Sequence, residues 1–169
     1  PGLNSRDSLA WQSVGLLALL TIVYMPILLS MVDHWRIVPD YSHGFLIVPL
    51  ALVFAYEKKY HLMAAEVDGD WWGVALLLVG LCLLAVGQLG SLLAPLRAGY
   101  VFSVMGLVLL LLGRNIFMLL LFPMAFPLLM IPLPQSLVNV VAFPLQLIAA
   151  QWAVSLLQTI GIPVLLEGN

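Results

Sequence analysis

The sequence has very few charged side chains for its length. Only 8% of its 169 residues are Asp, Glu, Lys or Arg, whereas a water-soluble domain carries about 25%. The hydrophobic content is 63% and the mean hydropathy is +1.12. So few charges cannot cover the surface of a globule of 18.5 kDa in water. The composition excludes a soluble globular domain and predicts an integral membrane protein whose main partner is lipid.

Other absences exclude further classes of protein. The net charge of −2 is too small to indicate nucleic-acid binding. The lone Cys82 cannot form an internal disulfide, and its Leu-Cys-Leu-Leu setting predicts a small apolar residue that fills the core. The sequence has no phosphate loop, serine elbow, cofactor fingerprint or paired catalytic carboxylates, so no cofactor is expected.

Apolar runs separated by polar residues, glycines and prolines predict an all-α fold, a polytopic transmembrane helical bundle of about five to six membrane helices. The second run is shorter than the ~20 residues that a full span requires. Pro123 and Pro127 should kink the fifth run. We expect residues 1–169 to form a single transmembrane domain, with a turn at residues 94–97 and a short extended segment at the C-terminal end, near residues 164–166. The runs cover residues 16–31, 44–56, 71–93, 99–112, 116–130 and 135–160.

The distribution of lysine and arginine indicates an orientation. If the runs alternate across the membrane, four basic residues lie on one side and two on the other: Arg6, Lys58, Lys59 and Arg114 against Arg36 and Arg97. This imbalance favours a cytoplasmic N-terminus, because cytoplasmic loops are richer in basic residues. Arg97 and Arg114 both flank apolar runs, where arginine side chains usually snorkel to the interface.

Several small or polar residues lie inside the apolar runs. Gly80, Gly87 and Gly90 are expected to permit close packing between helices. In the sixth run, residues 135–160, seven of the polar side chains lie on two roughly opposite sides of the predicted helix: Gln135, Asn139 and Gln146 on one, and Gln151, Ser155, Gln158 and Thr159 on the other. Such a helix either spans the membrane while packed between neighbours or lies tilted near one surface.

The densest polar group is the loop over residues 33–44, between the first two runs. Two histidines and two carboxylates within about a dozen residues are a combination that can bind a metal or move protons. The spacing matches no recognised zinc pattern, so no metal site is predicted. The simpler interpretation is a polar loop in which His43 caps or snorkels at the head of the next helix. His61 lies in the other polar loop and is expected to be solvated.

Three stretches resemble one known family. Tyr41-Ser42-His43-Gly44 with the Phe-Leu-Ile-Val-Pro that follows it resembles the "YSHG-x-L-I-x-P" signature of the exosortase family. The Ile-Pro-Leu-Pro at residues 131–134, with the helix containing Phe-Pro-Leu-Gln, resembles that family's central segment. The Gly-Ile-Pro-Val at residues 161–164 with the final Glu-Gly-Asn resembles the stretch ahead of the family's catalytic cysteine. The three stretches follow in the family's order and spacing.

The resemblance implies a membrane cysteine protease or transpeptidase of the bacterial inner membrane. Exosortases recognise a C-terminal sorting tail on exported proteins, typically Pro-Glu-Pro, a membrane span and basic residues (the PEP-CTERM system). They cleave there at the outer face and transfer the protein to an acceptor, often alongside exopolysaccharide production. The chemistry implied is attack of a cysteine on the scissile carbonyl to give an acyl-thioester, with an arginine and a histidine (or a second arginine) assisting.

The family's Cys-Ser-Gly motif and the later arginine and histidine are expected beyond Asn169. No residue of this chain is therefore expected to be catalytic, and whether the chain is an enzyme by itself is left open. Cys82 is not followed by Ser-Gly and is not the expected nucleophile. The candidates for supporting or substrate-contact roles are Tyr41, Ser42, His43 and Gly44. An active site at the outer face favours five crossings with a tilted sixth helix over six.

The alternative interpretation is a non-enzymatic polytopic membrane protein, such as a transporter subunit or an assembly scaffold. Prolines within helices, intramembrane glutamines and faces of small residues are also typical of transporters. A Cys-Ser-Gly motif shortly after Asn169 in the natural gene would distinguish the transpeptidase from this alternative. The sequence does not indicate an oligomeric state.

Overall fold

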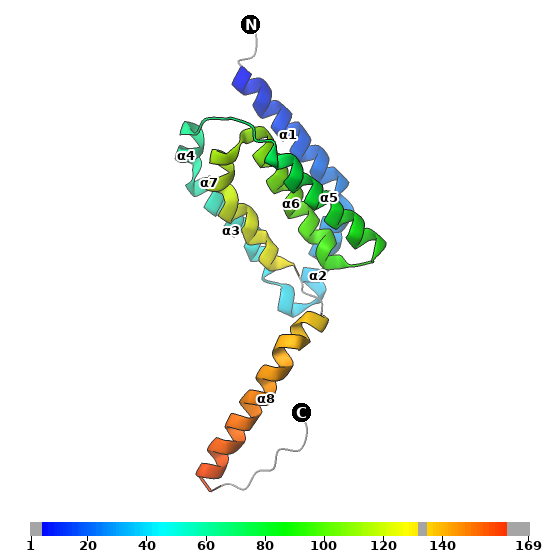
Figure 1. Cartoon of the computed structure of the whole chain (residues 1–169), viewed down its shortest axis with the longest axis vertical. Coiled ribbons are helices and arrows are strands. Elements are labelled where there is room, and N and C mark those ends of the chain that lie inside the picture. The colour runs from blue at the N-terminus through cyan, green and yellow to red at the C-terminus, as the bar shows by residue number, and fades with distance from the viewer. Residues whose placement is uncertain (1–4, 132–134, 162–169) are drawn as a thin grey trace. The chain divides into compact units, whose positions relative to one another are not determined.

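The computed structural model describes residues 5–131 and 135–161, and all the regular elements in these ranges are helical (Figure 1). The all-α prediction is confirmed, whereas the extended segment expected near residues 164–166 lies outside the described residues. The chain divides into two compact units, Pro1–Pro132 and Leu133–Asn169. The second unit contains α8 (Gln135–Thr159). The first contains α1 (Ser5–Val23), α2 (Met25–Ile37), the 3₁₀ helix η1 (Pro39–Tyr41), α3 (Gly44–Glu57), α4 (Lys59–Ala64), α5 (Trp72–Leu89), α6 (Leu93–Leu112), α7 (Arg114–Ala125) and the 3₁₀ helix η2 (Phe126–Met130).

Several of the described helices have the length and composition of membrane spans. α5, α6 and residues Val138–Thr159 of α8 are each long and apolar enough to cross a membrane. α1 and α2 together form a fourth candidate, bent by 63° at a short break. α3 and the segment Arg114–Met130 are apolar but shorter. The chain is therefore a multi-span membrane protein with three to four candidate spans among its described residues.

The first apolar run is broken at Tyr24, although its sequence indicated one continuous helix. Pro26 lies in the first turn of α2 and has no backbone N–H, so helical hydrogen bonding is interrupted there. Tyr24 is fully buried, and its hydroxyl donates to the carbonyl oxygen of Gly80 at 3.3 Å. The same hydroxyl lies 3.2 Å from Oγ of Ser103. The break thus inserts a phenol that connects the α1–α2 bend to both α5 and α6.

Replacing Tyr24 with phenylalanine is expected to lower the free energy of unfolding by about 0.6 to 1.7 kcal/mol, the range measured for interhelical hydrogen bonds in membranes. The aromatic ring and its packing are kept, so only the hydroxyl contacts are lost. Titration of the purified protein with a denaturing detergent in mixed micelles measures this change. Tyr60→Phe is the control, because Tyr60 is 72% exposed. Equal stability of both variants would contradict the role given to the Tyr24 hydroxyl.

Glycines bring α5 and α6 into close backbone contact, as the sequence predicted for Gly80 and Gly87. A Cβ atom at Gly80 would lie 2.8 Å from a carbonyl oxygen of α6, and one at Gly87 would lie 2.7 Å from a backbone nitrogen of α6. Gly99 and Gly106 of α6 lie similarly close to the backbone of α5. Gly90 is different, because it is exposed and ends α5 as its C-terminal cap. Small residues on both helices therefore build the central helix pair of the first unit.

The turn between α5 and α6 lies at residues 90–92, so the prediction of a turn at residues 94–97 is wrong. Ser91 has a positive φ of 53°, which reverses the chain direction at this point. Pro95 lies in the first turn of α6, where a missing N–H removes no helical hydrogen bond. The proline that indicated a turn therefore belongs to the start of a membrane helix.

Prolines divide the fifth run as predicted. Pro123 lies inside α7, and Pro127 lies in the first turns of η2, so the α-helix ends and a tighter 3₁₀ helix continues the chain. η2 packs against α3, and the rings of Phe54 and Phe126 meet edge to face, with centroids 5.3 Å apart. A buried cluster joins α2, α3 and η2, and its members are Met31, Trp35, Ile47 and Met130.

The two ends of the first unit differ in their number of basic residues. One end holds the start of α1, α4 and the α6–α7 junction, where residues Asp68 and Gly113 form a backbone bridge (Figure 1). The other end, called the Tyr41 end below, holds the α2–α3 connection, the α5–α6 turn and the end of η2 (Figure 1). The six basic residues divide between these ends as the alternation predicted: Arg6, Lys58, Lys59 and Arg114 against Arg36 and Arg97.

The described part of the second unit, residues 135–161, contains one α-helix, α8, which continues through Pro144. None of the residues Val138–Thr159 is buried. Polar and apolar side chains in this range are all intermediate or exposed, and Trp152 is 76% exposed. α8 therefore has the composition of a membrane helix but no core of its own.

Candidate functional site

The α2–α3 connection is built by one proline, Pro39, and local hydrogen bonds. α2 ends at Ile37, and Val38 is extended, which allows Pro39 to open the short helix η1. The Oγ atom of Ser42 donates to the carbonyl oxygen of Pro39 at 2.7 Å, and the Ser42 backbone N–H donates to the same oxygen at 3.1 Å. His43 precedes the first turn of α3 as its N-terminal cap residue. The connection is therefore a defined turn rather than an extended loop.

Three rings lie together at the Tyr41 end: those of Tyr41 and His43 from the connection, and that of His34 from α2. The ring of Tyr41 is half-buried, with its centroid 5.2 Å from that of His34 and 6.4 Å from that of His43. Ser42 and His43 are exposed. Of the four site residues predicted from the sequence, Tyr41 and His43 thus share a cluster with His34, which the prediction did not include. This cluster offers imidazole and phenol groups, which can donate or accept hydrogen bonds, to a ligand approaching from this end.

Gly44, the last of the four predicted residues, has a packing role. It is buried against the indole of Trp35, and a Cβ atom at this position would lie 2.5 Å from Nε1 and 2.7 Å from Cδ2 of that ring. Trp35 also meets Phe45 edge to face, with ring centroids 5.3 Å apart. The absence of a side chain at Gly44 therefore lets α2 and α3 meet directly behind the ring cluster.

The polar groups of this connection do not assemble into a metal site. Within residues 5–131 and 135–161, no three His, Cys, Asp or Glu side chains converge. The carboxylate of Asp33 forms an exposed ion pair with Arg36, at an N–O distance of 3.8 Å. The histidines and the tyrosine at this connection therefore offer hydrogen-bond donors and acceptors.

An apolar groove of about 710 Å³ lies in the first unit beside this connection. Side chains of α1, α2, α3, α6, α7 and η2 line it, nearly all of them hydrocarbon. Trp35, Phe45 and Met130 line the groove near the Tyr41 end, and Val108 lies further along α6. Such a lining suits an apolar segment of a ligand rather than a reacting polar group.

Arg97 contradicts the expectation that it snorkels to the interface. The side chain is only 4% exposed, and its Nε and Nη1 atoms are enclosed without a hydrogen-bond partner in the described part of the chain. The spacing of Arg97, Val101 and Val104 on one helical face was the available signal for this inward position. It was missed because residues 94–97 were assigned to a turn. Arg114, by contrast, is exposed at the other end.

Cys82 is also placed differently from its prediction. It is exposed on the surface of α5 rather than part of the core. It is the eleventh of the 18 residues of α5, near the middle of a candidate span. The thiol therefore lies on an exposed face of α5 and is not packed inside the first unit.

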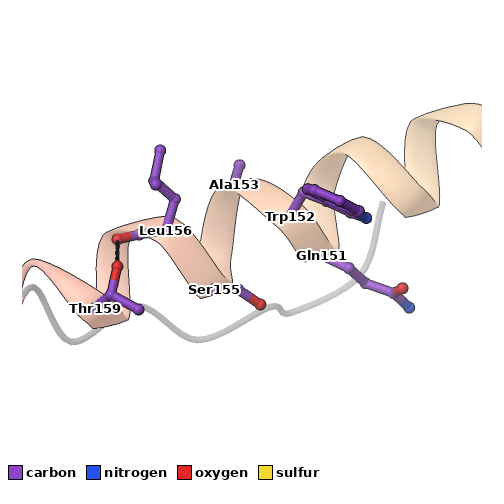
Figure 2. A pocket seen from close by; sticks show the side chains of 6 residues that line it. All are labelled: Gln151, Trp152, Ala153, Ser155, Leu156 and Thr159. Atoms are coloured by element: carbon purple, nitrogen blue, oxygen red, sulfur yellow. Dashed lines mark hydrogen bonds between the residues drawn. The ribbon is translucent and has the colours of Figure 1, made fainter.

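A shallow hollow follows one side of α8 within the second unit (Figure 2). The hydroxyl of Thr159 donates to the carbonyl oxygen of Leu156 at 2.6 Å, so it is engaged within the helix (Figure 2). The lining residues belong to a single helix and do not converge on a point. They are Gln151, Trp152, Ala153, Ser155, Leu156 and Thr159. This hollow offers no arrangement for catalysis.

Comparison with known families identifies one match. The family model described as transmembrane exosortase (Exosortase_EpsH) matches residues 35–169. The matched range begins at Trp35 and includes Tyr41 and His43 of the ring cluster, the apolar groove's α3, α6 and α7 walls, and α8. No curated protein and no solved structure matches the chain. The family resemblance noted in the sequence is confirmed.

Proposed function

Because the chain belongs to the transmembrane exosortase family, we propose that it forms the membrane-embedded part of a cysteine protease or transpeptidase. The enzyme cleaves C-terminal sorting tails of exported proteins at the outer face of the bacterial inner membrane. It thereby serves the sorting of surface proteins and exopolysaccharide-linked export. The family match over residues 35–169 is the observation that carries this proposal.

The proposed topology places the Tyr41 end outside and the N-terminus in the cytoplasm. Its support is the separation of the basic residues, with four at the Lys58 end and two at the Tyr41 end. In this scheme residues 1–169 form one transmembrane domain of five to six membrane helices. α3 and the segment Arg114–Met130 supply the crossings that are shorter than a straight span.

In the proposed reaction a cysteine thiolate attacks the scissile carbonyl, and the carbon–nitrogen bond breaks as an acyl-thioester forms. An acceptor nucleophile then releases the protein from the thioester. Cys82 does not fit the nucleophile's role, because it lies near the middle of a candidate span, on an exposed face of α5. Tyr41, Ser42, His43 and Gly44 support the substrate at the outer face: His43 and Tyr41 by hydrogen bonds, and Gly44 by holding the turn against Trp35.

Processing of a reporter with a sorting tail by the natural full-length protein tests this role. We expect His43→Ala to lower the cleaved fraction about tenfold, as lost supporting contacts at active sites typically do. His61→Ala is the matched control, because His61 is an exposed histidine at the opposite end. Immunoblots of cleaved and uncleaved reporter in cells that express equal amounts of each variant give the measurement. Unchanged cleavage in His43→Ala would remove this residue from the site.

Replacing Cys82 with alanine is expected to leave reporter cleavage at the wild-type level. The exposed thiol in mid-span makes no contact that the proposed chemistry uses. The same immunoblot measures the effect, and complete loss of cleavage with normal protein abundance would contradict the assignment. If deletion of the whole gene left tailed proteins processed as before, the enzyme function itself would be wrong, and the non-enzymatic alternative would replace it.

A further inference from the structure

Arg97 is a charged group enclosed in the first unit without an acceptor. Its Nε and Nη1 atoms have no hydrogen-bond partner, and the residue is 96% buried, since only 4% of its surface is exposed. Arg36 and Arg114 differ, because both are exposed and Arg36 pairs with Asp33. A buried charge is normally paired or bound to a ligand, because an unpaired one is strongly unfavourable. We therefore expect the Arg97 guanidinium to bind an anionic group from outside the described residues.

Arg97 lies on the same face of α6 as the residues of that helix that line the apolar groove. α6 contributes Tyr100, Val101, Val104 and Val108 to the lining of that groove. These residues follow Arg97 by three, four, seven and eleven positions, so all five share one face of the helix. Arg97 is the fifth residue of α6, about 6 Å along the axis from the start of the helix. Arg97 thus lies one turn along α6 from Tyr100 and Val101, the nearest groove-lining residues of that helix.

A second donor without an acceptor lines the same groove. The Nε1 atom of Trp35 is buried and has no hydrogen-bond partner in the described part of the chain, and the indole forms part of the groove wall. Arg97 and Trp35 offer N–H donors only and no acceptor. A ligand that satisfies both groups must carry acceptor oxygens, preferably anionic, and an apolar portion that fits the groove.

We propose that the apolar groove binds a phospholipid of the surrounding bilayer, with an acyl chain along the groove and the phosphate group on Arg97. Guanidinium groups bind phosphate oxygens by charge-assisted hydrogen bonds. Basic pockets between membrane helices are recognised binding sites for lipid headgroups. The indole N–H of Trp35 adds a neutral donor for an oxygen of the same lipid. This lipid site does not depend on the tail-cleaving function proposed above.

Three probes test the proposal on the whole chain purified in a non-ionic detergent and freed of lipid. They are phosphatidylglycerol, a diacylglycerol with the same acyl chains, and inorganic phosphate. Native mass spectrometry and the shift in melting temperature report binding. We expect phosphatidylglycerol to bind at least about tenfold more tightly than diacylglycerol, the ratio that one charge-assisted hydrogen bond gives. Equal binding of the two lipids, or equal binding of inorganic phosphate, would overturn the proposal.

Substitutions of Arg97 provide a second test. Arg97→Gln should reduce the affinity for phosphatidylglycerol about tenfold and leave that for diacylglycerol unchanged. Arg97→Lys should keep part of the preference, because the charge remains. Arg114→Gln is the control and should bind as the wild type does, since Arg114 is exposed at the other end. Wild-type affinity of Arg97→Gln for phosphatidylglycerol would refute the site. If that variant does not fold, the comparison of phosphatidylglycerol with diacylglycerol on the wild-type protein decides whether the site exists.

Discussion

Replacing Gly80 with leucine is expected to separate α5 from α6 and to lower the free energy of unfolding by about 3 kcal/mol, the upper end of the usual range for overpacked interiors. A Cβ atom at Gly80 would lie 2.6 Å from the backbone nitrogen of Ser103 and 2.8 Å from the carbonyl oxygen of Gly99. Both contacts are with backbone, which cannot move aside without shifting a helix. The hydroxyl of Tyr24 would also lose its partners, because it bonds to Gly80 and Ser103.

Gly15→Leu is the matched control for this variant. Nothing lies within 4 Å of a Cβ atom at Gly15, so the same side chain is added there without a clash. Detergent-denaturation curves of the two purified variants give the comparison. If Gly80→Leu is no less stable than Gly15→Leu, the close pairing of α5 and α6 is wrong.

Replacing Gly44 with leucine is the second change for which we expect a large effect, again about 3 kcal/mol. The new side chain would occupy the space of the Trp35 indole, which is 5% exposed and part of the buried cluster of α2, α3 and η2. Displacing this ring also moves the turn that carries Tyr41 and His43. Loss of stability should therefore accompany loss of tail processing in the full-length protein.

A double-mutant cycle isolates the Gly44–Trp35 contact. Trp35→Ala alone should cost about 3 to 5 kcal/mol, as aromatic truncations in a core do. Combining it with Gly44→Leu should cost less than the sum of the two, by about 1 kcal/mol or more, because the leucine then enters the vacated space. Strictly additive losses would show that the two residues do not meet. Leu46→Ala, at a residue that is 62% exposed on the same helix, should change stability little.

The helices could be predicted from the sequence because each apolar run is a separate, strong signal. The beginnings of α3 and α8 and the end of α6 at Gly113 agree with the predicted runs. The break at Tyr24 and the turn at residues 90–92 were missed, because a proline can open a helix as readily as end one. Which role a proline takes depends on tertiary packing that the sequence does not display.

Burial was the least predictable property, for a physical reason. In a membrane both the protein core and the lipid are apolar, so hydropathy cannot tell which side of a helix meets protein. Cys82 was therefore assigned to the core although it is exposed, and Arg97 to the interface although it is buried. The Tyr41–Gly44 turn was found because its residues form a recognisable motif. Trp35 was not found, because its contact with Gly44 joins two helices.

Cysteine labelling in spheroplasts tests the central claim most directly, namely that the Tyr41 end faces the outside of the inner membrane. The background variant is Cys82→Ala, which leaves no other cysteine in this chain. Ser42 and Lys58 are both exposed, and they lie at opposite ends of α3, because Ser42 precedes this helix and Lys58 follows it. Ser42→Cys should react with a membrane-impermeant maleimide in intact spheroplasts, and Lys58→Cys only after permeabilisation. Labelling of Lys58→Cys but not of Ser42→Cys in intact spheroplasts would contradict the outward orientation of the Tyr41 end.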